Sequence, residues 1–153
     1  MSEFRLGFRS QQKLEGVHPT LVKVIERALQ LSTIDFSVLE GVRTEARQKE
    51  LYNQGRVTAG PIVTWTLKSR HFKQPDGYGH AVDLVPSPVD WNDLKKFDAI
   101  AAAMFAAAKE LGVDLRWGAD WDQDGNKRER GETDSPHFEF AGMVAAAKPK
   151  KGK

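Results

Sequence analysis

Residues 69–83 read SRHFKQPDGYGHAVD, and residues 134–139 read DSPHFE. These two stretches contain His71, Asp83 and His137, and Asp134 lies three residues before the last of them. A catalytic zinc ion usually takes three such ligands and keeps its fourth position for a water molecule, whose pKa falls to about 7 on the metal. The two stretches therefore predict a zinc site made by the two histidines and Asp83, with Asp134 as the general base.

An alternative ligand, His80, lies three residues before Asp83. If residues 81–85 form a buried strand, successive side chains point to opposite faces of the sheet. His80 and Asp83 then face opposite ways and cannot readily share a metal ion, which favours His71 as the ligand.

The residues after His137 follow the same alternation. His137 and Glu139 share one face of a short predicted strand, while Phe138 and Phe140 face the core. Two interpretations of Glu139 stay open. It either orients a metal ligand from outside the coordination shell, or it is an ordinary solvated or salt-bridged carboxylate.

The whole chain predicts one small α+β domain over residues 1–144. Its 153 residues suit a single hydrophobic core, and 40% apolar with 29% charged residues is typical of a globular protein. Apolar residues recur at helical spacing in residues 19–31 and in a second helix that we expect to start near Asp90 and end at Gly112. Extended runs predict an antiparallel sheet on which the two helices pack and whose edge carries the metal site. These runs are residues 36–40, 81–85 and 113–117.

The composition excludes several kinds of site. The chain has no cysteine, which removes thiolate zinc ligands, a cysteine nucleophile and disulfides together. Its net charge of +2 is too small to argue for nucleic acid, and no apolar run reaches the ~20 residues needed to span a bilayer. We expect a monomer with no nucleic-acid partner and no stable membrane insertion.

Several motifs resemble those of one known family. Ser69-Arg70-His71 followed by Gly79-His80-Ala81-Val82-Asp83 resembles the signature Ser-x-His-x-x-Gly-x-Ala-x-Asp of the zinc D-Ala-D-Ala carboxypeptidase and L-alanyl-D-glutamate peptidase family. Further similar segments are Gly41-Val42-Arg43-Thr44, Arg116-Trp117-Gly118-Ala119-Asp120-Trp121 and Asp134-x-x-His137-Phe138-Glu139. The resemblance runs from about Phe36 to Phe140 and implies a hedgehog/D,D-peptidase-like fold. One departure is an apparent insertion, because residues 72–78 stand where the family has two residues.

The resemblance also implies roles for residues outside the ligand set. Arg43 would stabilise the oxyanion of the tetrahedral intermediate and hold substrate oxygens, whereas a surface salt bridge is the alternative. Gln48, on a helix that Thr44 can cap, would support Arg43. Ser69 would hydrogen-bond near the metal or the substrate.

The family includes cell-wall peptidases, vancomycin-resistance dipeptidases and many phage endolysins. The first residues, MSEFRLGFRS, lack an apolar run of signal-peptide length, so we expect no leader, and the resemblance points to an endolysin. We therefore expect a zinc-dependent L-alanyl-D-glutamate endopeptidase that cleaves bacterial peptidoglycan and lyses the host. It would accumulate in the host cytoplasm and reach the cell wall once another protein opens the membrane. Two alternatives stay open: a D-alanyl-D-alanine carboxypeptidase or dipeptidase, and a non-catalytic module that binds cell-wall peptide.

Two further segments carry predictions of their own. Residues 120–126, DWDQDGN, resemble the first half of a calcium loop with Asp120, Asp122 and Asp124 as candidate ligands. Gly131 stands where the full pattern needs a glutamate, so a solvated acidic turn is the alternative. Residues 145–153, AAAKPKKGK, predict a basic disordered tail that either binds anionic cell-wall polymers or only aids solubility.

Overall fold

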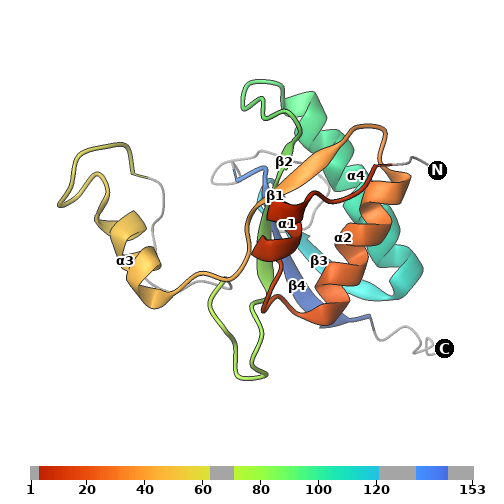
Figure 1. The fold of residues 1–153 in the computed structure, drawn as a ribbon, viewed down its shortest axis with the longest axis horizontal. Helices are drawn as coiled ribbons and strands as arrows, with labels where there is room; N and C mark the ends of the chain where they lie inside the picture. Colours follow the sequence, from red (N-terminus) through yellow and green to blue (C-terminus); the bar gives the residue numbers. More distant parts are fainter. Residues whose placement is uncertain (1–3, 63–70, 121–133, 145–153) are drawn as a thin grey trace.

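The computed structural model describes residues 4–62, 71–120 and 134–144 (Figure 1). The chain begins with two helices and ends with two strands, and helices and strands alternate between them. In order they are α1 (Phe8–Lys13), α2 (Pro19–Leu31), β1 (Phe36–Glu40), α3 (Glu45–Asn53), β2 (Ala81–Pro86), α4 (Leu94–Leu111), β3 (Val113–Trp117) and β4 (His137–Met143). Within the described ranges, no helix is both long and apolar enough to cross a membrane.

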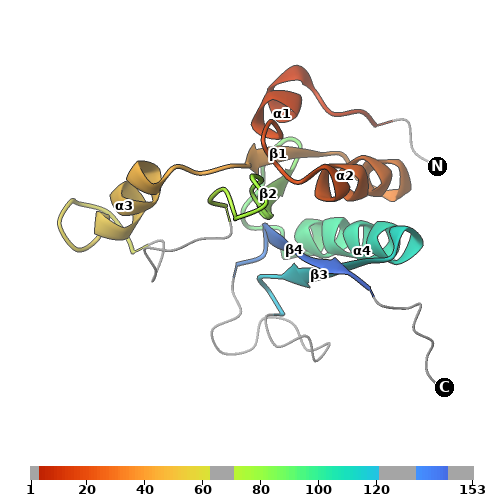
Figure 2. The same cartoon turned by 90° about the horizontal axis from the view of Figure 1, so that it is seen from below.

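The four strands form one antiparallel sheet, as the sequence predicts. The structure gives their order as β1-β2-β4-β3. Figure 2 shows α2 and α4 side by side, and α4 also contacts β2 and β3. The register places Phe138 opposite both Val82 and Trp117, and all three side chains are buried in the core. Helices α2 and α4 therefore cover one face of the sheet.

The opposite face of the sheet carries the polar residues. Asp83 is paired with His137, and Glu139 is paired with both Ala81 and Arg116. Since side chains alternate along a strand, these residues point away from the face that packs on the helices. Charged groups of β2, β3 and β4 thus gather on one surface without entering the apolar core.

Local sequence explains where the two long helices begin and end. Pro19 is the first residue of α2, and the ring of His18 accepts a hydrogen bond from the backbone N–H of Thr20 at 3.1 Å. Helix α4 ends at Gly112, which adopts the left-handed conformation with φ 69°. The core-facing helix over residues 19–31 and the stop at Gly112 are confirmed.

The predicted start of the second helix near Asp90 is wrong, because α4 begins at Leu94. Asp90 instead accepts a hydrogen bond from the backbone N–H of Asn92 at 3.1 Å, which turns the chain before the helix starts. Asp93 then caps α4 by accepting from the backbone N–H of Lys95 at 3.2 Å.

Helix α3 stands away from the sheet and the other helices (Figures 1 and 2). Thr44 caps it by accepting from the backbone N–H of Arg47 at 3.1 Å, as the sequence predicts. Among the described side chains of this helix, only Gln48 is buried. That residue points back toward the polar face of the sheet.

Candidate metal centre

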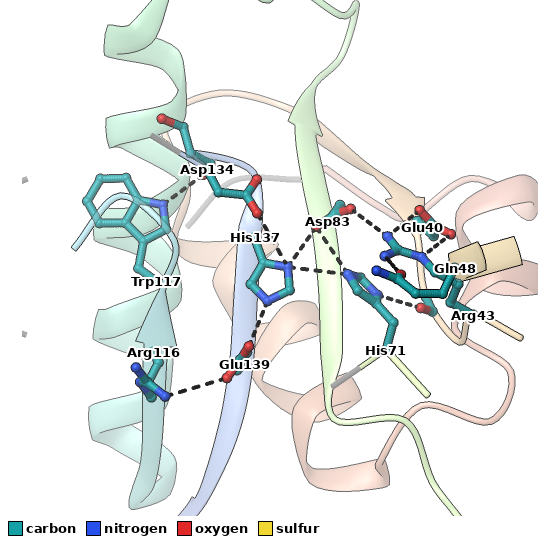
Figure 3. A network of polar contacts seen from close by, with 12 residues as sticks. Glu40, Arg43, Gln48, His71, Asp83, Arg116, Trp117, Asp134, His137 and Glu139 are labelled. Carbon is teal, nitrogen blue, oxygen red and sulfur yellow. Dashed lines mark hydrogen bonds and ion pairs between the residues drawn. The ribbon is translucent and has the colours of Figure 1, made fainter. Parts of the chain in front are cut away.

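Three side chains from distant parts of the sequence converge on the polar face of the sheet (Figure 3). His71 comes from the segment before β2, Asp83 lies within β2, and His137 is the first residue of β4. The Nε2 atom of His71 lies 3.3 Å from Nδ1 of His137 and 3.4 Å from Oδ1 of Asp83. The third distance, from Nδ1 of His137 to Oδ1 of Asp83, is 3.2 Å. Within the described residues, this is the one group of three that could hold a metal ion.

The outer nitrogen of each imidazole has its own partner. Nδ1 of His71 lies 2.7 Å from the backbone carbonyl oxygen of Gly41, and Nε2 of His137 lies 3.0 Å from a carboxylate oxygen of Glu139. A carbonyl and an ionised carboxylate only accept hydrogen bonds, so both outer nitrogens carry a proton. The inner nitrogens of both rings then face one common position together with Oδ1 of Asp83, as ring nitrogens do when they bind a metal.

The electrostatics of the cluster also favour a cation. His71 is 1% exposed, and the side chains of His137 and Asp83 are 10% and 14% exposed. Burial disfavours a charged imidazole, but hydrogen bonds to Asp83 and Glu139 outweigh it and raise the pKa of His137 to about 10. Burial likewise disfavours the Asp83 carboxylate, but hydrogen bonds from His137 and His71 outweigh it and lower the pKa of Asp83. Two inner nitrogens and one carboxylate oxygen thus require either a proton or a metal ion between them.

Asp134 lies at the open edge of this cluster. Its Oδ2 is 3.9 Å from Nδ1 of His137, and its side chain is 53% exposed, within reach of water and substrate. Partial desolvation raises the pKa of Asp134, the imidazole of His137 opposes that shift, and the carboxylate of Asp83 adds to it. A carboxyl group with a raised pKa beside a metal-binding point suits proton transfer.

Main-chain contacts with the end of β3 hold Asp134 and His137 in place. The indole N–H of Trp117 donates to the backbone carbonyl of Ser135 at 2.7 Å, and the N–H of Gly118 donates to that of His137 at 2.8 Å. A Cβ atom on Gly118 would lie only 2.2 Å from the backbone oxygen of Asp134. The Trp-Gly pair was part of the family resemblance, but sequence reasoning assigned it no task, and the structure shows that it supports the turn carrying Asp134.

Arg43 approaches the cluster from the other side. Its guanidinium makes two hydrogen bonds to the carboxylate of Glu40, at 2.9 and 2.8 Å, and donates to the amide oxygen of Gln48 at 2.5 Å. Its Nη2 also lies 3.8 Å from Oδ2 of Asp83, the oxygen that faces away from the histidines. Gln48 does contact Arg43 from α3, and the Arg43 side chain is only 10% exposed, so it is not a surface salt bridge. Sequence reasoning missed Glu40, which it treated only as the last residue of a strand.

Glu139 has the contacts of a residue that orients His137. One carboxylate oxygen contacts His137, and the other lies 3.8 Å from a guanidinium nitrogen of Arg116. Its side chain is 12% exposed, which rules out a fully solvated carboxylate. The contact with His137 fits the first interpretation, and the ion pair with Arg116 also fits the salt-bridged carboxylate of the second.

His80 lies away from the cluster, as the alternation along β2 predicts. Its Nε2 atom is 2.7 Å from a carboxylate oxygen of Asp76, and its ring packs edge-on against Phe140 on the core side of the sheet. Phe140 belongs to the hydrophobic core, whereas His71 and His137 face the opposite surface. His80 is therefore not part of the metal-binding group.

Some predicted positions lie outside the described residues. These are Ser69, the calcium candidates Asp122 and Asp124, and the tail at residues 145–153. Asp120 is described, and its backbone N–H donates to the carbonyl of Trp117 at 3.0 Å. Calcium binding, substrate binding by Ser69 and the role of the tail stay predictions.

An antiparallel sheet flanked by helices, with a His–Asp–His group on its open face, defines a small α+β protein of the peptidase type found among D,D-dipeptidases and L-Ala-D-Glu endopeptidases. Residues 1–141 match the family model described as phage L-alanyl-D-glutamate peptidase. The chain belongs to this family of peptidoglycan hydrolases.

Individual relatives support this assignment. The chain is 37% identical over 143 residues to the L-alanyl-D-glutamate peptidase of Escherichia phage T5, covering 90% of this chain and 98% of that protein. It is 34% identical over 159 aligned positions to the peptidoglycan L-alanyl-D-glutamate endopeptidase CwlK of Bacillus subtilis, covering 91% of this chain and 86% of the relative.

Two solved structures resemble the fold. The Serratia marcescens L-Ala D-Glu endopeptidase ChiX aligns with a TM-score of 0.69 and 38% identity, covering 90% of this chain and 91% of that one. The vancomycin-resistance D,D-dipeptidase VanXYg aligns with a TM-score of 0.50 and 17% identity, covering 82% of this chain and 51% of that one. The second similarity shows the fold alone.

Proposed function

We propose that this chain is a zinc-dependent endopeptidase that hydrolyses the bond between L-alanine and D-glutamate in the peptidoglycan stem peptide. The observation that carries this proposal is the convergence of Nε2 of His71, Oδ1 of Asp83 and Nδ1 of His137 within a family of peptidoglycan peptidases. Relatives from a phage and from two bacteria, named for this bond, support the choice of substrate.

The residues present fit a zinc ion. Two neutral imidazoles and one carboxylate are a common protein ligand set for catalytic zinc, and the sequence contains no cysteine that could supply a thiolate ligand. Each imidazole is oriented by an acceptor on its outer nitrogen, the usual arrangement around protein-bound zinc. When bound, zinc would polarise the scissile carbonyl and lower the pKa of an attacking water molecule.

Asp134 is the proposed general base. It accepts a proton from the water whose oxygen attacks the carbonyl carbon of L-alanine, and it then delivers that proton to the nitrogen of D-glutamate as the C–N bond breaks. The products are a carboxylate on alanine and a free amine on glutamate. The raised pKa of Asp134 favours the first half of this transfer, because the group is a better proton acceptor than an ordinary aspartate.

Arg43 is the proposed electrostatic partner of the reaction. Glu40 and Gln48 fix its guanidinium beside Asp83, so little reorganisation is needed when negative charge develops on the substrate oxygen. The guanidinium also pairs with Oδ2 of Asp83, which leaves Oδ1 directed at the two histidines. Arg43 would thus act on both the substrate and the metal ligand.

In its biological setting, we propose that the chain acts as an endolysin on the host cell wall. Peptidoglycan lies outside the cytoplasmic membrane, so the enzyme would reach it after another protein has opened that membrane. Cleavage of the stem peptide removes the cross-links that hold the wall together, and lysis follows.

The decisive experiment is mass spectrometry of the fragments released from peptidoglycan sacculi. Zinc-loaded protein should release fragments with a new D-glutamate amino terminus, and a chelated sample should release none. Release of free D-alanine alone would instead identify a D,D-carboxypeptidase. Binding to sacculi with no release from zinc-loaded protein would favour the binding module and contradict the enzyme.

A further inference from the structure

The excursion between His71 and β2 is held to the body of the protein by its own polar contacts. It is the yellow-green loop at the lower edge of Figure 1, and it contains the inserted residues 72–78. His71, which must reach the metal, begins this loop, and Gly79 ends it. A longer loop gives His71 more conformations, so something must restrict it if the metal site is to be formed in advance.

Asp76, at the tip of the loop, makes three contacts. Its Oδ1 accepts a hydrogen bond from the backbone N–H of Tyr78 at 3.0 Å, which closes the turn. Its Oδ2 lies 2.7 Å from Nε2 of His80 and 3.8 Å from Nε2 of His18. One carboxylate therefore joins the loop to the start of α2 and to the residue that precedes β2.

The two histidines present N–H groups to Asp76. Nδ1 of His18 accepts the hydrogen bond that caps α2, so Nε2 carries the proton when this ring is neutral. The ring of His18 stacks on Phe140 with centroids 4.3 Å apart, and the ring of His80 packs edge-on against Phe140 with centroids 5.4 Å apart. Both donor rings are thus held against the core by Phe140.

The positions of the imidazole protons also exclude a second metal centre at Asp76, His18 and His80. A metal ion needs ring nitrogens without a proton, whereas the nitrogen of His18 that faces Asp76 carries one. In the part of the chain that the structure describes, the one potential metal-binding trio is that of His71, Asp83 and His137. The contacts of Asp76 therefore hold the loop in place and do not form a metal site.

The base of the loop is closed as tightly as its tip. The N–H of Gly79 donates to the carbonyl of Gly16 and the N–H of His18 donates to that of Gly79, both at 2.9 Å. The carbonyl oxygen of His71 in turn accepts from the N–H of Arg43 at 2.9 Å. A Cβ atom on Gly79 would lie 3.1 Å from that same carbonyl oxygen, so the two ends of the loop are nearly in contact.

We propose that Asp76 is a positioning residue for the metal centre: by tying the inserted loop to His18 and His80, it keeps the His71 ring where it can share a metal ion with Asp83 and His137. The inference rests on the proposed metal centre and adds a residue that touches neither metal nor substrate. Removing this tie leaves His71 held only by the contacts at the base of the loop, so its ring leaves the site in part of the population. Loss of the tie should therefore weaken metal binding itself.

The experiment compares four variants of the full chain with the wild type. Asp76→Ala and His80→Ala remove the tie from either side, and His80→Gln keeps an N–H donor near the position of Nε2. The matched control is Asp90→Ala, because Asp90 closes the same kind of turn, accepting from a backbone N–H two residues ahead, and its ion pair is with Lys96 instead of a histidine. Zinc affinity is measured by competition with a chromophoric chelator. Cobalt-substituted protein gives an absorption spectrum that reports the number of ligands.

We expect Asp76→Ala and His80→Ala to lower zinc affinity by about tenfold, at the lower end of the range for residues that support a metal ligand. Their cobalt spectra should change in intensity as His71 is lost from part of the population. His80→Gln and Asp90→Ala should behave as the wild type in both measurements.

The remaining outcomes would overturn the inference. If Asp76→Ala lowers the melting temperature of the metal-free protein but leaves zinc affinity and the cobalt spectrum unchanged, the tie is only structural. An equal loss of affinity in Asp90→Ala would show a general effect of removing surface turns. If the wild type binds no zinc, the proposed metal centre fails and this inference with it, whereas zinc binding that no variant weakens refutes this inference alone.

Discussion

The inner nitrogens of His71 and His137, Nε2 of one and Nδ1 of the other, lie 3.3 Å apart and both approach Oδ1 of Asp83. Each ring reaches this arrangement because an acceptor holds its outer N–H, the carbonyl of Gly41 for one and the carboxylate of Glu139 for the other. The two inner nitrogens and the Asp83 oxygen are all hydrogen-bond acceptors when both imidazoles are neutral. In the metal-free protein, a proton on His137 therefore turns one of them into a donor. A metal ion would take the place of that proton.

The first prediction concerns the pH dependence of the metal-free protein. The pKa of His137 is raised from 6.5 to about 10, so the folded state holds a proton that the unfolded state releases above about 6.5. This contribution to stability is fully present below about 6.5 and is lost as the pH rises through about 10. The free energy of unfolding of chelated protein, measured by urea denaturation, should therefore fall across this range. A His137→Gln variant should show a flatter profile over the same interval, and an unchanged profile would contradict the pairing with Asp83.

The second prediction tests the general base. Asp134→Asn should lower turnover on peptidoglycan by about 100-fold to 10,000-fold, the usual contribution of general acid–base catalysis, because an amide cannot accept the proton. Zinc affinity should change little, since the carboxylate lies 3.9 Å from Nδ1 of His137. Asp114→Asn, at an exposed position on β3, is the control and should keep full activity. Retained turnover in Asp134→Asn would eliminate this residue as the base.

The third prediction concerns Glu139. Replacing it with glutamine removes the charge that holds the outer N–H of His137, so zinc affinity should fall by about tenfold or more. Arg116→Gln should have a smaller effect, because the ion pair of Arg116 with Glu139, at 3.8 Å, is longer than the contact of Glu139 with His137. Chelator competition gives both values, and equal affinities for Glu139→Gln and the wild type would argue that the contact is incidental.

The fourth prediction compares two arginines that each pair with a glutamate three residues away. Arg43→Lys should lower the free energy of unfolding by about 1–3 kcal/mol, because a lysine cannot satisfy Glu40 and the buried Gln48 together. Arg47→Lys should change it by about 0.5 kcal/mol or less, since the Arg47–Glu50 pair is 55% and 68% exposed. Urea denaturation measures both, and turnover should fall only in the first. Equal stabilities would show that the buried contacts of Arg43 contribute little.

The fifth prediction concerns a position without a side chain. Gly118→Ala would place a methyl group 2.2 Å from the backbone oxygen of Asp134, so the turn that carries the base must shift. Turnover should drop by about 100-fold, because misplacing a catalytic group by about 1 Å has this effect. Gly112→Ala is not a suitable control, since Gly112 adopts a left-handed conformation, but Gly7→Ala meets no atom within 4 Å and should be active. Full activity in Gly118→Ala would show that the turn is looser than its contacts imply.

Period-two and helical patterns were enough to predict much of the fold and the orientation of some site residues. The alternation along β2 correctly placed His80 and Asp83 on opposite faces, and the apolar spacing in residues 19–31 predicted α2 to the residue. These predictions succeeded because they depend only on near neighbours in the chain.

The contacts that the sequence did not reveal join residues far apart in the chain. His71 is held by a main-chain carbonyl 30 residues away, at Gly41, and any residue type carries such a carbonyl. Gly118 was missed for a similar reason, because its role depends on which turn lies beside it. Glu40 is an exception, since its partner Arg43 is only three residues away, but the pairing depends on the path of the chain after β1. The start of α4 was misplaced because Asp90 and Asp93 are both good turn and cap residues, and only the three-dimensional path decides between them.

Gly41 sets a condition on any attempt to transplant this centre into another scaffold. A Cβ atom there would lie 1.9 Å from the carbonyl oxygen of Lys13, so the main chain passes this point in close contact with the end of α1. A designer who copied only the three ligands would leave the outer nitrogen of His71 without its acceptor. A transplanted site would therefore need the crossing of these two main-chain segments as well as the three ligands. The new scaffold must have a residue without a side chain at that crossing.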